Sequence, residues 1–150
     1  SLNKNKIIFC GNGGSAADSS HVVAELIGRY LKKKRKALNA ISLNDNISTI
    51  TALSNDFDYK YVFSRQLEGI GKKGDVLFAI STSGKSKNIL EVIKVAKKRK
   101  IKTVMLTGQN RFNKNSVDCC IKVPAKRVDR IQELHIIVLH LLSEYLDESF

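Results

Sequence analysis

The fold of this chain is decided by the stretch Ile7-Ile8-Phe9-Cys10-Gly11-Asn12-Gly13-Gly14-Ser15-Ala16-Ala17-Asp18. Its short apolar run with β-branched residues is typical of a strand that is covered on both faces. The glycines that follow let backbone N–H groups approach a ligand closely. Apolar residues then recur at helical spacing over residues 15–30, which predicts a helix whose positive N-terminal end faces the glycine loop. The stretch therefore predicts a cradle for an anion, and we expect a phosphate group.

The rest of the chain alternates predicted strands with predicted helices. Further strands are predicted at residues 37–43, 75–80, 101–106 and 117–123. Helices are predicted from residue 47 to the break at residues 54–56, and at residues 59–70, 88–100 and 127–148. This alternation indicates an α/β fold, with a five-stranded parallel sheet that is flanked by helices on both faces and joined by right-handed crossovers. The 150 residues are expected to form a single domain.

A second polar loop, Ser81-Thr82-Ser83-Gly84-Lys85-Ser86, follows the third predicted strand and precedes a helix. It offers four hydroxyl groups, a glycine and a helix N-terminus, which can together donate many hydrogen bonds to one phosphate. An ordinary helix cap needs only one such hydroxyl group, so we favour phosphate binding. Because ligands of parallel sheets bind beyond the carboxyl ends of the strands, both polar loops are expected to serve one site.

The glycine loop also satisfies the dinucleotide fingerprint GxGxxA, with Asp45 as a candidate for the ribose-binding acid. That fingerprint alone is a weak signal. Ser15 at the helix entrance and the second, hydroxyl-rich loop favour a monophosphate instead, so no nucleotide cofactor is expected.

Net charge is +12, which favours acidic partners. The densest basic run, Lys32-Lys33-Lys34-Arg35-Lys36, is interpreted as a solvated loop. Nucleic-acid binding is not favoured, because the chain has no Trp, no aromatic residue within that run, and neither zinc-finger nor RNP spacing.

Cysteine usage and hydropathy bear on the compartment. Cys10, Cys119 and Cys120 form no CxxC pair and are interpreted as small buried hydrophobic residues, which suits a reducing compartment. No apolar run reaches the roughly 18–20 residues that span a bilayer, and no signal peptide is visible, so we expect a cytoplasmic protein without a membrane anchor. The chain begins with Ser1 and enters its first strand almost at once, which leads us to expect that an N-terminal segment is missing.

Two helices carry candidate catalytic or metal-binding side chains. His21 and Glu25 are four residues apart and so share one face of the first helix, within reach of one metal ion or one substrate. The last helix carries Gln132, His135 and His140, with Glu133 beside them. Gln132 and His140 share one broad side, but spacing alone leaves open which of the two histidines is functional.

Taken together, these motifs resemble the phosphoheptose isomerases, a branch of the sugar isomerase (SIS) domain family. The resemblance runs from Lys6 to the C-terminus. It rests on the segments Cys-Gly-Asn-Gly-Gly-Ser-Ala (10–16), His21 with Ala-Glu-Leu (24–26), Gly-Arg-Tyr (28–30), Asn-Asp-Phe (55–57), Phe-Ser-Arg-Gln (63–66), Ile-Ser-Thr-Ser-Gly (80–84) and Arg-Ile-Gln-Glu-Leu-His (130–135).

The resemblance implies a SIS-type fold, a homotetramer and an aldose–ketose isomerase that interconverts sedoheptulose 7-phosphate and D-glycero-D-manno-heptose 7-phosphate. That reaction is the entry step to bacterial surface heptoses. The implied catalytic pair is Glu25 as the base and His140 as the acid. The implied zinc ligands are His21, Glu25, Gln132 and His140. The implied substrate-binding residues, which include Glu25, are Asn12, Gly13, Gly14, Ser15, Asn55, Asp56, Ser81, Thr82, Ser83, Ser86, Asp129 and Gln132.

Two features depart from that family, and two alternatives stay open. The helical segment that similar proteins carry before the first strand is absent, and the loop after Thr107 lacks their usual glycines.

The alternatives are a SIS-fold scaffold that binds the bacterial replication initiator and a regulatory domain that senses a sugar phosphate. Scaffolding relatives lack the acid/base pair, so the presence of Glu25 and His140 favours the enzyme.

Overall fold

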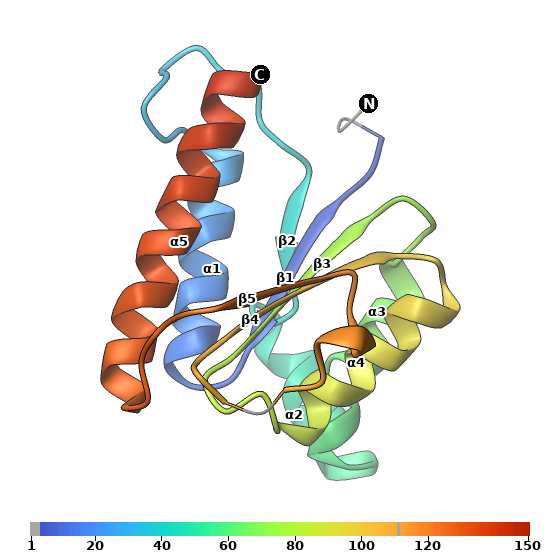
Figure 1. Cartoon of the computed structure of the whole chain (residues 1–150). Coiled ribbons are helices and arrows are strands. Elements are labelled where there is room, and N and C mark those ends of the chain that lie inside the picture. Colours follow the sequence, from blue (N-terminus) through green and yellow to red (C-terminus); the bar gives the residue numbers. More distant parts are fainter. Residues whose placement is uncertain (1–3, 111) are drawn as a thin grey trace.

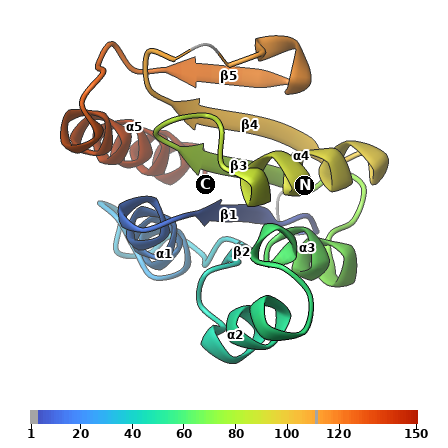
Figure 2. The same ribbon diagram turned by 90° about the horizontal axis from the view of Figure 1, so that it is seen from below.

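The structure is a computed structural model that describes residues 4–110 and 112–150. Five parallel strands form one sheet in the order β2-β1-β3-β4-β5 (Figure 2). The strands are β1 (Ile7–Gly11), β2 (Ala40–Ser42), β3 (Val76–Ser81), β4 (Lys102–Thr107) and β5 (Cys119–Lys122). The predicted α/β architecture with a five-stranded parallel sheet is confirmed.

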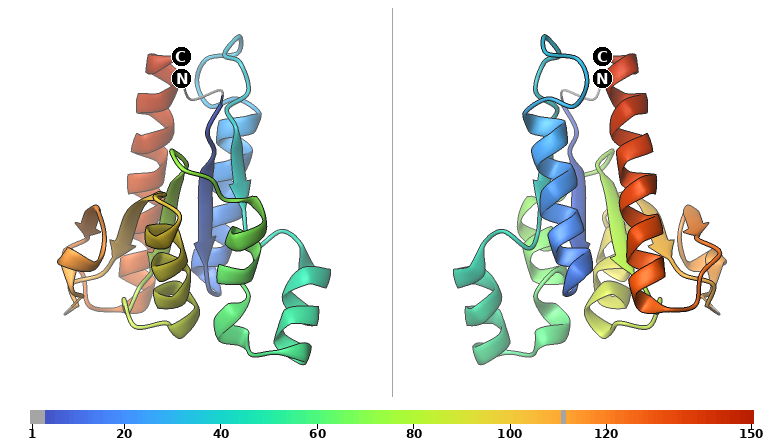
Figure 3. Two further views of the ribbon diagram at one scale, coloured as in Figure 1. Left: turned by 90° about the vertical axis from the view of Figure 1, so that its right-hand side faces the viewer. Right: turned by 90° about the vertical axis from the view of Figure 1, so that its left-hand side faces the viewer.

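Helices cover both faces of the sheet, giving three layers (Figure 1). They are α1 (Gly14–Ile27), α2 (Ile47–Asp56), α3 (Ser64–Ile70), α4 (Lys87–Lys98) and α5 (Val128–Ser149), with short 3-10 turns at Tyr59–Tyr61 and Lys114–Ser116. The helices α1 and α5 lie side by side on one face, and α3 and α4 lie on the other with α2 beyond them (Figure 3).

The alternation of side chains along the strands explains the two layers of core. Ile8 and Cys10 of β1 point into the cluster under α3 and α4, whereas Ile7 and Phe9 point into the cluster under α1 and α5. All four are buried, as expected of a central strand in a parallel sheet.

Two predicted elements differ from those observed. The predicted strand at 37–43 is paired only over Ala40–Ser42. The predicted helix at 59–70 is divided into a 3-10 turn and α3. Val62 and Phe63 between them are buried and keep helical backbone dihedrals, but Val62 N donates to Tyr59 O, and α-helical bonding begins only with the bond from Leu67 N to Phe63 O. The other elements start and end within about two residues of their predicted bounds. The exception is α1, which ends at Ile27 although the helix was predicted to continue to residue 30.

Strand order places the two polar loops together. The chain passes from β1 to the outer strand β2 and then crosses to β3 on the other side of β1, so the strand order reverses between β1 and β3. The crevice outside such a reversal is where open α/β sheets bind ligands. The loops that follow β1 and β3 therefore lie next to each other at the carboxyl edge of the sheet.

Burial corrects two sequence interpretations. Cys119 is exposed and Cys120 is half-buried because β5 is an edge strand, so only Cys10 is the buried hydrophobe that was predicted. Arg35 is not part of a solvated loop. Its guanidinium is buried, pairs with Asp147 of α5 and donates to carbonyl oxygens at the end of α1.

Across the two described ranges, no helix combines the length and the apolar character that a membrane crossing requires.

Candidate active site

Three glycines shape the loop after β1, each in a different way. Gly13 has φ of +57°, which L side chains rarely adopt, and it sets the entry into α1. A Cβ on Gly14 would collide with the amide of Gln132, so the absence of a side chain lets α5 approach the first turn of α1. Gly11 is held by the Asn44 side chain, which accepts from Gly11 N at 3.1 Å and donates to Gly11 O at 2.8 Å.

The second loop holds its hydroxyl groups in a tight turn. The hydroxyls of Ser81 and Ser86 are 3.2 Å apart, and Ser81 Oγ accepts from Gly84 N at 3.1 Å. Thr82 O accepts from the Asn110 side chain at 2.6 Å and from Gly108 N at 3.2 Å, which ties the loop to the end of β4. Ser86 occupies the N-cap of α4 without a side-chain cap bond, so its hydroxyl is not used as an ordinary cap.

Asn12 joins the two loops. Its side-chain amide exchanges two hydrogen bonds with that of Asn88 in the first turn of α4, at 2.8 and 2.9 Å, and its oxygen also accepts from the Tyr59 hydroxyl at 2.9 Å. A hollow of about 310 Å³ lies here, and Asn12 and Ser86 both line it. The convergence of the two polar loops at one edge is thus confirmed. The full lining is Asn12, Asp58, Tyr59, Lys60, Ser86, Lys87 and Asn88.

A second group of side chains lies between α1 and α5. His21 Nε2 is 3.3 Å from Glu25 Oε1, as the four-residue spacing predicted, and 3.3 Å from His140 Nε2 of α5. The ring of Tyr30 stacks on His140 at a centroid distance of 5.8 Å. Since a ring nitrogen either carries a proton or accepts one, His21 Nε2 can hydrogen-bond to one of its two neighbours at a time. Glu25 and His140 therefore lie within hydrogen-bonding distance of one shared nitrogen.

The fold separates the two histidines that spacing left open. His140 reaches the group on α1, whereas His135 is fully buried and points toward the sheet. Neither ring nitrogen of His135 has a partner that meets hydrogen-bond geometry within the described residues. Burial lowers the pKa of His135 by more than the nearby Thr107 backbone raises it, which favours the neutral imidazole. Of the two histidines, His140 is therefore the one that lies beside the candidate residues of α1.

Three of the residues implied by the resemblance stand apart from these groups in the single chain. Asn55 and Asp56 are exposed at the end of α2, where the Asn55 amide donates to Asp56 Oδ1 at 2.9 Å. Asp129 is exposed in the first turn of α5, and its hydrogen bonds from Arg127 hold the pKa of its carboxyl below the usual value. Within the described residues, none of the three forms a hydrogen bond or an ion pair with the two loops or with the histidines.

Comparison with known proteins gives one consistent answer. The sequence model of the SIS domain family matches residues 1–108. The phosphoheptose isomerase of Nitratiruptor sp. is 50% identical over 149 residues, which cover 99% of this chain and 79% of that protein. The chain belongs to the phosphoheptose isomerases of the SIS domain family.

Solved structures of phosphoheptose isomerases share the fold. The structure from Neisseria gonorrhoeae superposes with a TM-score of 0.86 at 38% sequence identity, covering 98% of this chain and 78% of that chain. The structure from Francisella tularensis superposes with a TM-score of 0.89 at 31% sequence identity, covering 97% of this chain and 78% of that chain. The SIS-type fold that the sequence indicated is confirmed, and so is membership of an isomerase family.

The implied zinc ligands of this isomerase are only partly assembled. Ligands of a tetrahedral zinc ion, with bonds of about 2.0–2.1 Å, lie about 3.3–3.4 Å apart. The distances of His21 Nε2 from Glu25 and from His140 match that separation. Gln132 instead packs on Gly14, and no complete group of three or more His, Cys, Asp or Glu ligands is formed among the residues described. The donor types and two of the distances fit zinc, whereas a closed ligand set is not present.

Sequence reasoning missed several residues of the isomerase site. Asn88 and Tyr59 fix Asn12, yet nothing in their spacing distinguishes them from ordinary helix and turn residues. Asp18 lies one turn after Gly14 and one turn before His21 on α1. Its Oδ2 is buried without a partner in the described structure, and burial raises the pKa of the carboxyl. Its position in the helical repeat could have identified it as a neighbour of His21.

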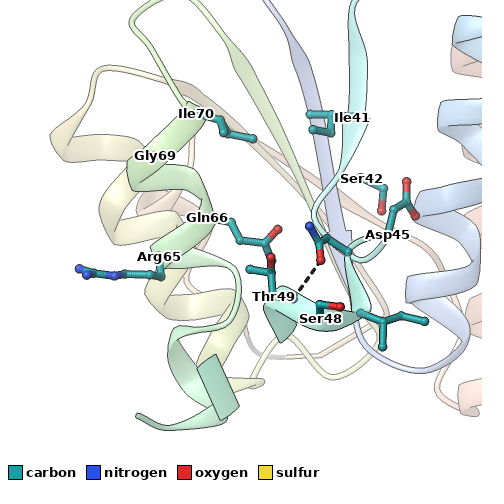
Figure 4. A pocket seen from close by; sticks show the side chains of 11 residues that line it. Ile41, Ser42, Asp45, Ser48, Thr49, Arg65, Gln66, Gly69 and Ile70 are labelled. Atoms are coloured by element: carbon teal, nitrogen blue, oxygen red, sulfur yellow. Dashed lines mark hydrogen bonds between the residues drawn. The ribbon is translucent and has the colours of Figure 1, made fainter. Parts of the chain in front are cut away.

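A larger hollow lies elsewhere on the isomerase, at the edge strand β2. It measures about 750 Å³, opens between β2, α2 and α3, and includes the Asn46 side chain that caps α2 by accepting from Thr49 N at 2.9 Å (Figure 4). Its lining comprises Ile41, Ser42, Asp45, Asn46, Ile47, Ser48, Thr49, Arg65, Gln66, Gly69 and Ile70. Apart from Asp45, the candidate for a ribose-binding acid, none of these is a predicted site residue, so this hollow lies away from the proposed catalytic pair.

Proposed function

We propose that this protein interconverts sedoheptulose 7-phosphate and D-glycero-D-manno-heptose 7-phosphate through an enediol intermediate, as the first step of ADP/GDP-heptose synthesis for surface polysaccharides such as lipopolysaccharide or capsule. One observation carries the proposal: Glu25 and His140, from two different helices, both lie 3.3 Å from the same atom of His21. A carboxylate and an imidazole so placed can share the two proton transfers of an aldose–ketose isomerisation.

The chemical step needs a base and an acid. Moving the carbonyl between C1 and C2 requires removal of a proton from one carbon and transfer of protons between the two oxygens. We assign Glu25 as the base that moves the carbon-bound proton and His140 as the group that moves protons at the oxygens. The side chain of Glu25 is about one quarter exposed, at 28%, so the carboxylate is open to substrate.

Substrate binding is assigned to the carboxyl edge of the sheet. The hydroxyls of Ser81, Thr82, Ser83 and Ser86 and the N-terminus of α4 would hold the phosphate by hydrogen bonds and the helix dipole. The backbone of residues 12–15 and the side chains of Asn55, Asp56, Asp129 and Gln132 would contact the sugar. The phosphate would anchor the substrate so that its carbonyl end reaches α1 and α5.

We also propose one zinc ion per subunit. His21, Glu25, Gln132 and His140 would hold it, and the ion would polarise the substrate carbonyl and stabilise negative charge on oxygen. A carboxylate that is bound to a metal is a poor base at the same moment, so whether the metal is catalytic or structural is part of the test below.

Assembly and compartment belong to the same proposal. Asn55, Asp56 and Asp129 stand apart from the catalytic pair in one chain, and the exposed face of α5 carries Ile137 and Leu141. These features support a homotetramer in which neighbouring subunits complete each site. The sugar phosphate substrate suits a cytoplasmic enzyme.

Turnover of sedoheptulose 7-phosphate, followed by NMR with and without chelator and added zinc, tests the proposal. The wild-type protein should form the aldoheptose phosphate, and loss of turnover with chelator would assign the metal a role.

Glu25→Gln should bind the substrate but lose at least about 100-fold in kcat, the range for a general base. Ala24→Ser, on the exposed side of the same helix turn, is the control and should keep the wild-type rate.

The alternative functions predict other outcomes. A folded, tetrameric protein that gives no product in any condition would support the replication-initiator scaffold or the sugar-phosphate sensor. Near-normal turnover of Glu25→Gln would overturn the assignment of the base without overturning the isomerase.

A further inference from the structure

The amino edge of the sheet, opposite the active site, carries a dense group of basic residues. Three segments meet there: the residues before β1, the loop before β3, and the end of α4 with the start of β4 (Figure 1). Backbone hydrogen bonds join them, from Lys102 N to Asp75 O at 3.0 Å and from Val76 N to Lys6 O at 2.9 Å. We call this group the basic edge, and its members are Lys4, Lys6, Lys72, Lys73, Lys97, Lys98, Arg99, Lys100 and Lys102.

A hollow of about 490 Å³ opens within the basic edge. Asp118 is the one carboxylate in its lining, and it is already engaged by Lys102 Nζ at 2.9 Å and by the backbone and hydroxyl of Thr103. The remaining lysines of the lining form no ion pair with any described residue. The lining comprises Lys73, Lys97, Lys100, Ile101, Lys102, Asn115, Val117 and Asp118.

Backbone geometry fixes Lys100 at the rim of this hollow. Lys100 N donates to Lys97 O at 3.1 Å and Ile101 N donates to Ala96 O at 2.9 Å, which is the Schellman motif that ends many helices. Glycine is usual at the position of Lys100, since φ is positive there, and Lys100 has φ of +56°. It is the one non-glycine residue with positive φ in the described ranges. A lysine stands where glycine would be less strained.

Helix capping explains only part of this charge. Lys97 and Lys98 lie in the last turn of α4, where cations interact favourably with the helix dipole. Lys73 comes from a different segment, and Lys102 belongs to β4. The stability of α4 therefore does not account for four lysines around one hollow.

We propose that this hollow binds a compact polyphosphate anion, such as the di- or triphosphate group of a nucleotide. Lys73, Lys97 and Lys100 form no ion pair among the described residues, and these three lysines can balance three negative charges, which is more than one monophosphate carries. The lining has no aromatic side chain on which bases could stack, and lysine acts on phosphate as a point charge. The basic edge also has no exposed large hydrophobic residue, so it does not fit a lipid surface. Because the hollow and the active site lie at opposite edges of the sheet, the proposal does not rest on the isomerase activity.

Titration calorimetry of the full chain with inorganic tripolyphosphate tests the proposal. The triple variant Lys73→Ala/Lys97→Ala/Lys100→Gly should bind at least tenfold more weakly than wild type. The control Lys32→Ala/Lys33→Ala/Lys34→Ala removes the same formal charge from another loop at the same edge and should bind within about twofold of wild type.

Further variants separate the remaining explanations. Lys100→Gly alone should bind several-fold more weakly while its melting temperature rises, so that its loss of binding is not a loss of fold. Ser83→Ala should leave tripolyphosphate binding unchanged; if it abolishes binding instead, the anion occupies the active-site loop and the proposal is wrong. Equal losses in both triple variants, or stronger binding of a duplex oligonucleotide than of tripolyphosphate at equal phosphate concentration, would also overturn it.

Discussion

Asp147, near the end of α5, connects the two helices that carry the proposed catalytic pair, Glu25 and His140. Its side chain is 2% exposed and accepts hydrogen bonds from the backbone N–H groups of Leu31 and Lys32, each at 2.7 Å, and from Arg35 Nε. The Arg35 guanidinium is 1% exposed and donates in turn to carbonyl oxygens at the end of α1. We predict that Asp147→Asn destabilises the fold and loosens the contact between His21 and His140.

The magnitude follows from leaving Arg35 buried without a counter-ion. Removing one partner of a buried ion pair costs about 3–5 kcal/mol. Arg35 keeps three carbonyl acceptors, from Glu25, Leu26 and Lys36, so we expect the lower end, about 3 kcal/mol. This is a large part of the roughly 5–15 kcal/mol that stabilises a domain. In a chain of this length it corresponds to a fall in Tm of about 6–12 °C.

Urea and thermal unfolding, followed by circular dichroism at pH 7, measure the effect. The control is Glu148→Gln, an exposed neighbour whose loss should change the free energy of unfolding by less than about 0.5 kcal/mol. An Asp147→Asn variant within that same margin of wild type would refute the reasoning, because the ion pair would then contribute nothing.

The pH dependence of the same variant gives a second check. Burial by itself raises the pKa of Asp147. The hydrogen bonds from the Lys32 and Leu31 N–H groups and from Arg35 together lower that pKa by more than burial raises it, so the pKa in the folded state is below the usual value. A carboxyl with a lowered pKa stabilises the fold above its unfolded pKa, and that contribution is lost as the pH falls through the folded pKa. The difference in the free energy of unfolding between wild type and Asp147→Asn should therefore become smaller below about pH 4. A difference that stays constant down to pH 2 would contradict the linkage.

Two further predictions concern the loops at opposite edges of the sheet. Ser83→Ala should raise the KM for a phosphorylated substrate by about tenfold while kcat stays within about threefold of wild type, because one hydrogen bond to phosphate contributes about 1–2 kcal/mol. An unchanged KM in steady-state kinetics would show that Ser83 does not bind the phosphate. Lys100→Gly should raise the free energy of unfolding by about 1 kcal/mol, because glycine adopts the φ of +56° without strain; a fall in stability, measured by urea unfolding, would show that the side chain makes contacts that outweigh the strain.

Local sequence was sufficient for most of the fold. The apolar run 7–10, the glycines that end it and the repeated order of strand, polar loop and helix predicted a parallel sheet, and the structure confirms it. The four-residue spacing of His21 and Glu25 likewise predicted their contact, because helix geometry fixes which side chains share a face. Errors arose where burial rather than local pattern decides the backbone. Residues 59–70 have helical spacing throughout, yet the α-helical hydrogen bonds are interrupted at Val62 and Phe63, which are buried.

The candidate site was predictable only in part. The residues on each loop and on each helix were identified from sequence, but spacing did not distinguish His140 from His135. Tertiary packing does so, since it buries His135 against the sheet and brings His140 to His21. Asn88 and Tyr59 were missed because their role is to hold Asn12, a residue more than 40 positions away.

The sequence by itself determined the order of the elements, the chemistry available at each loop and the faces of the helices, all of which depend on neighbours within a few residues. Only the tertiary structure decided that Arg35 leaves its basic run to pair with Asp147, and that lysines from separate segments surround one hollow. It also decided that the hollow of about 750 Å³ beside β2 lies away from the proposed catalytic pair. These outcomes depend on which distant segments become adjacent when the core is buried, and no local pattern encodes that.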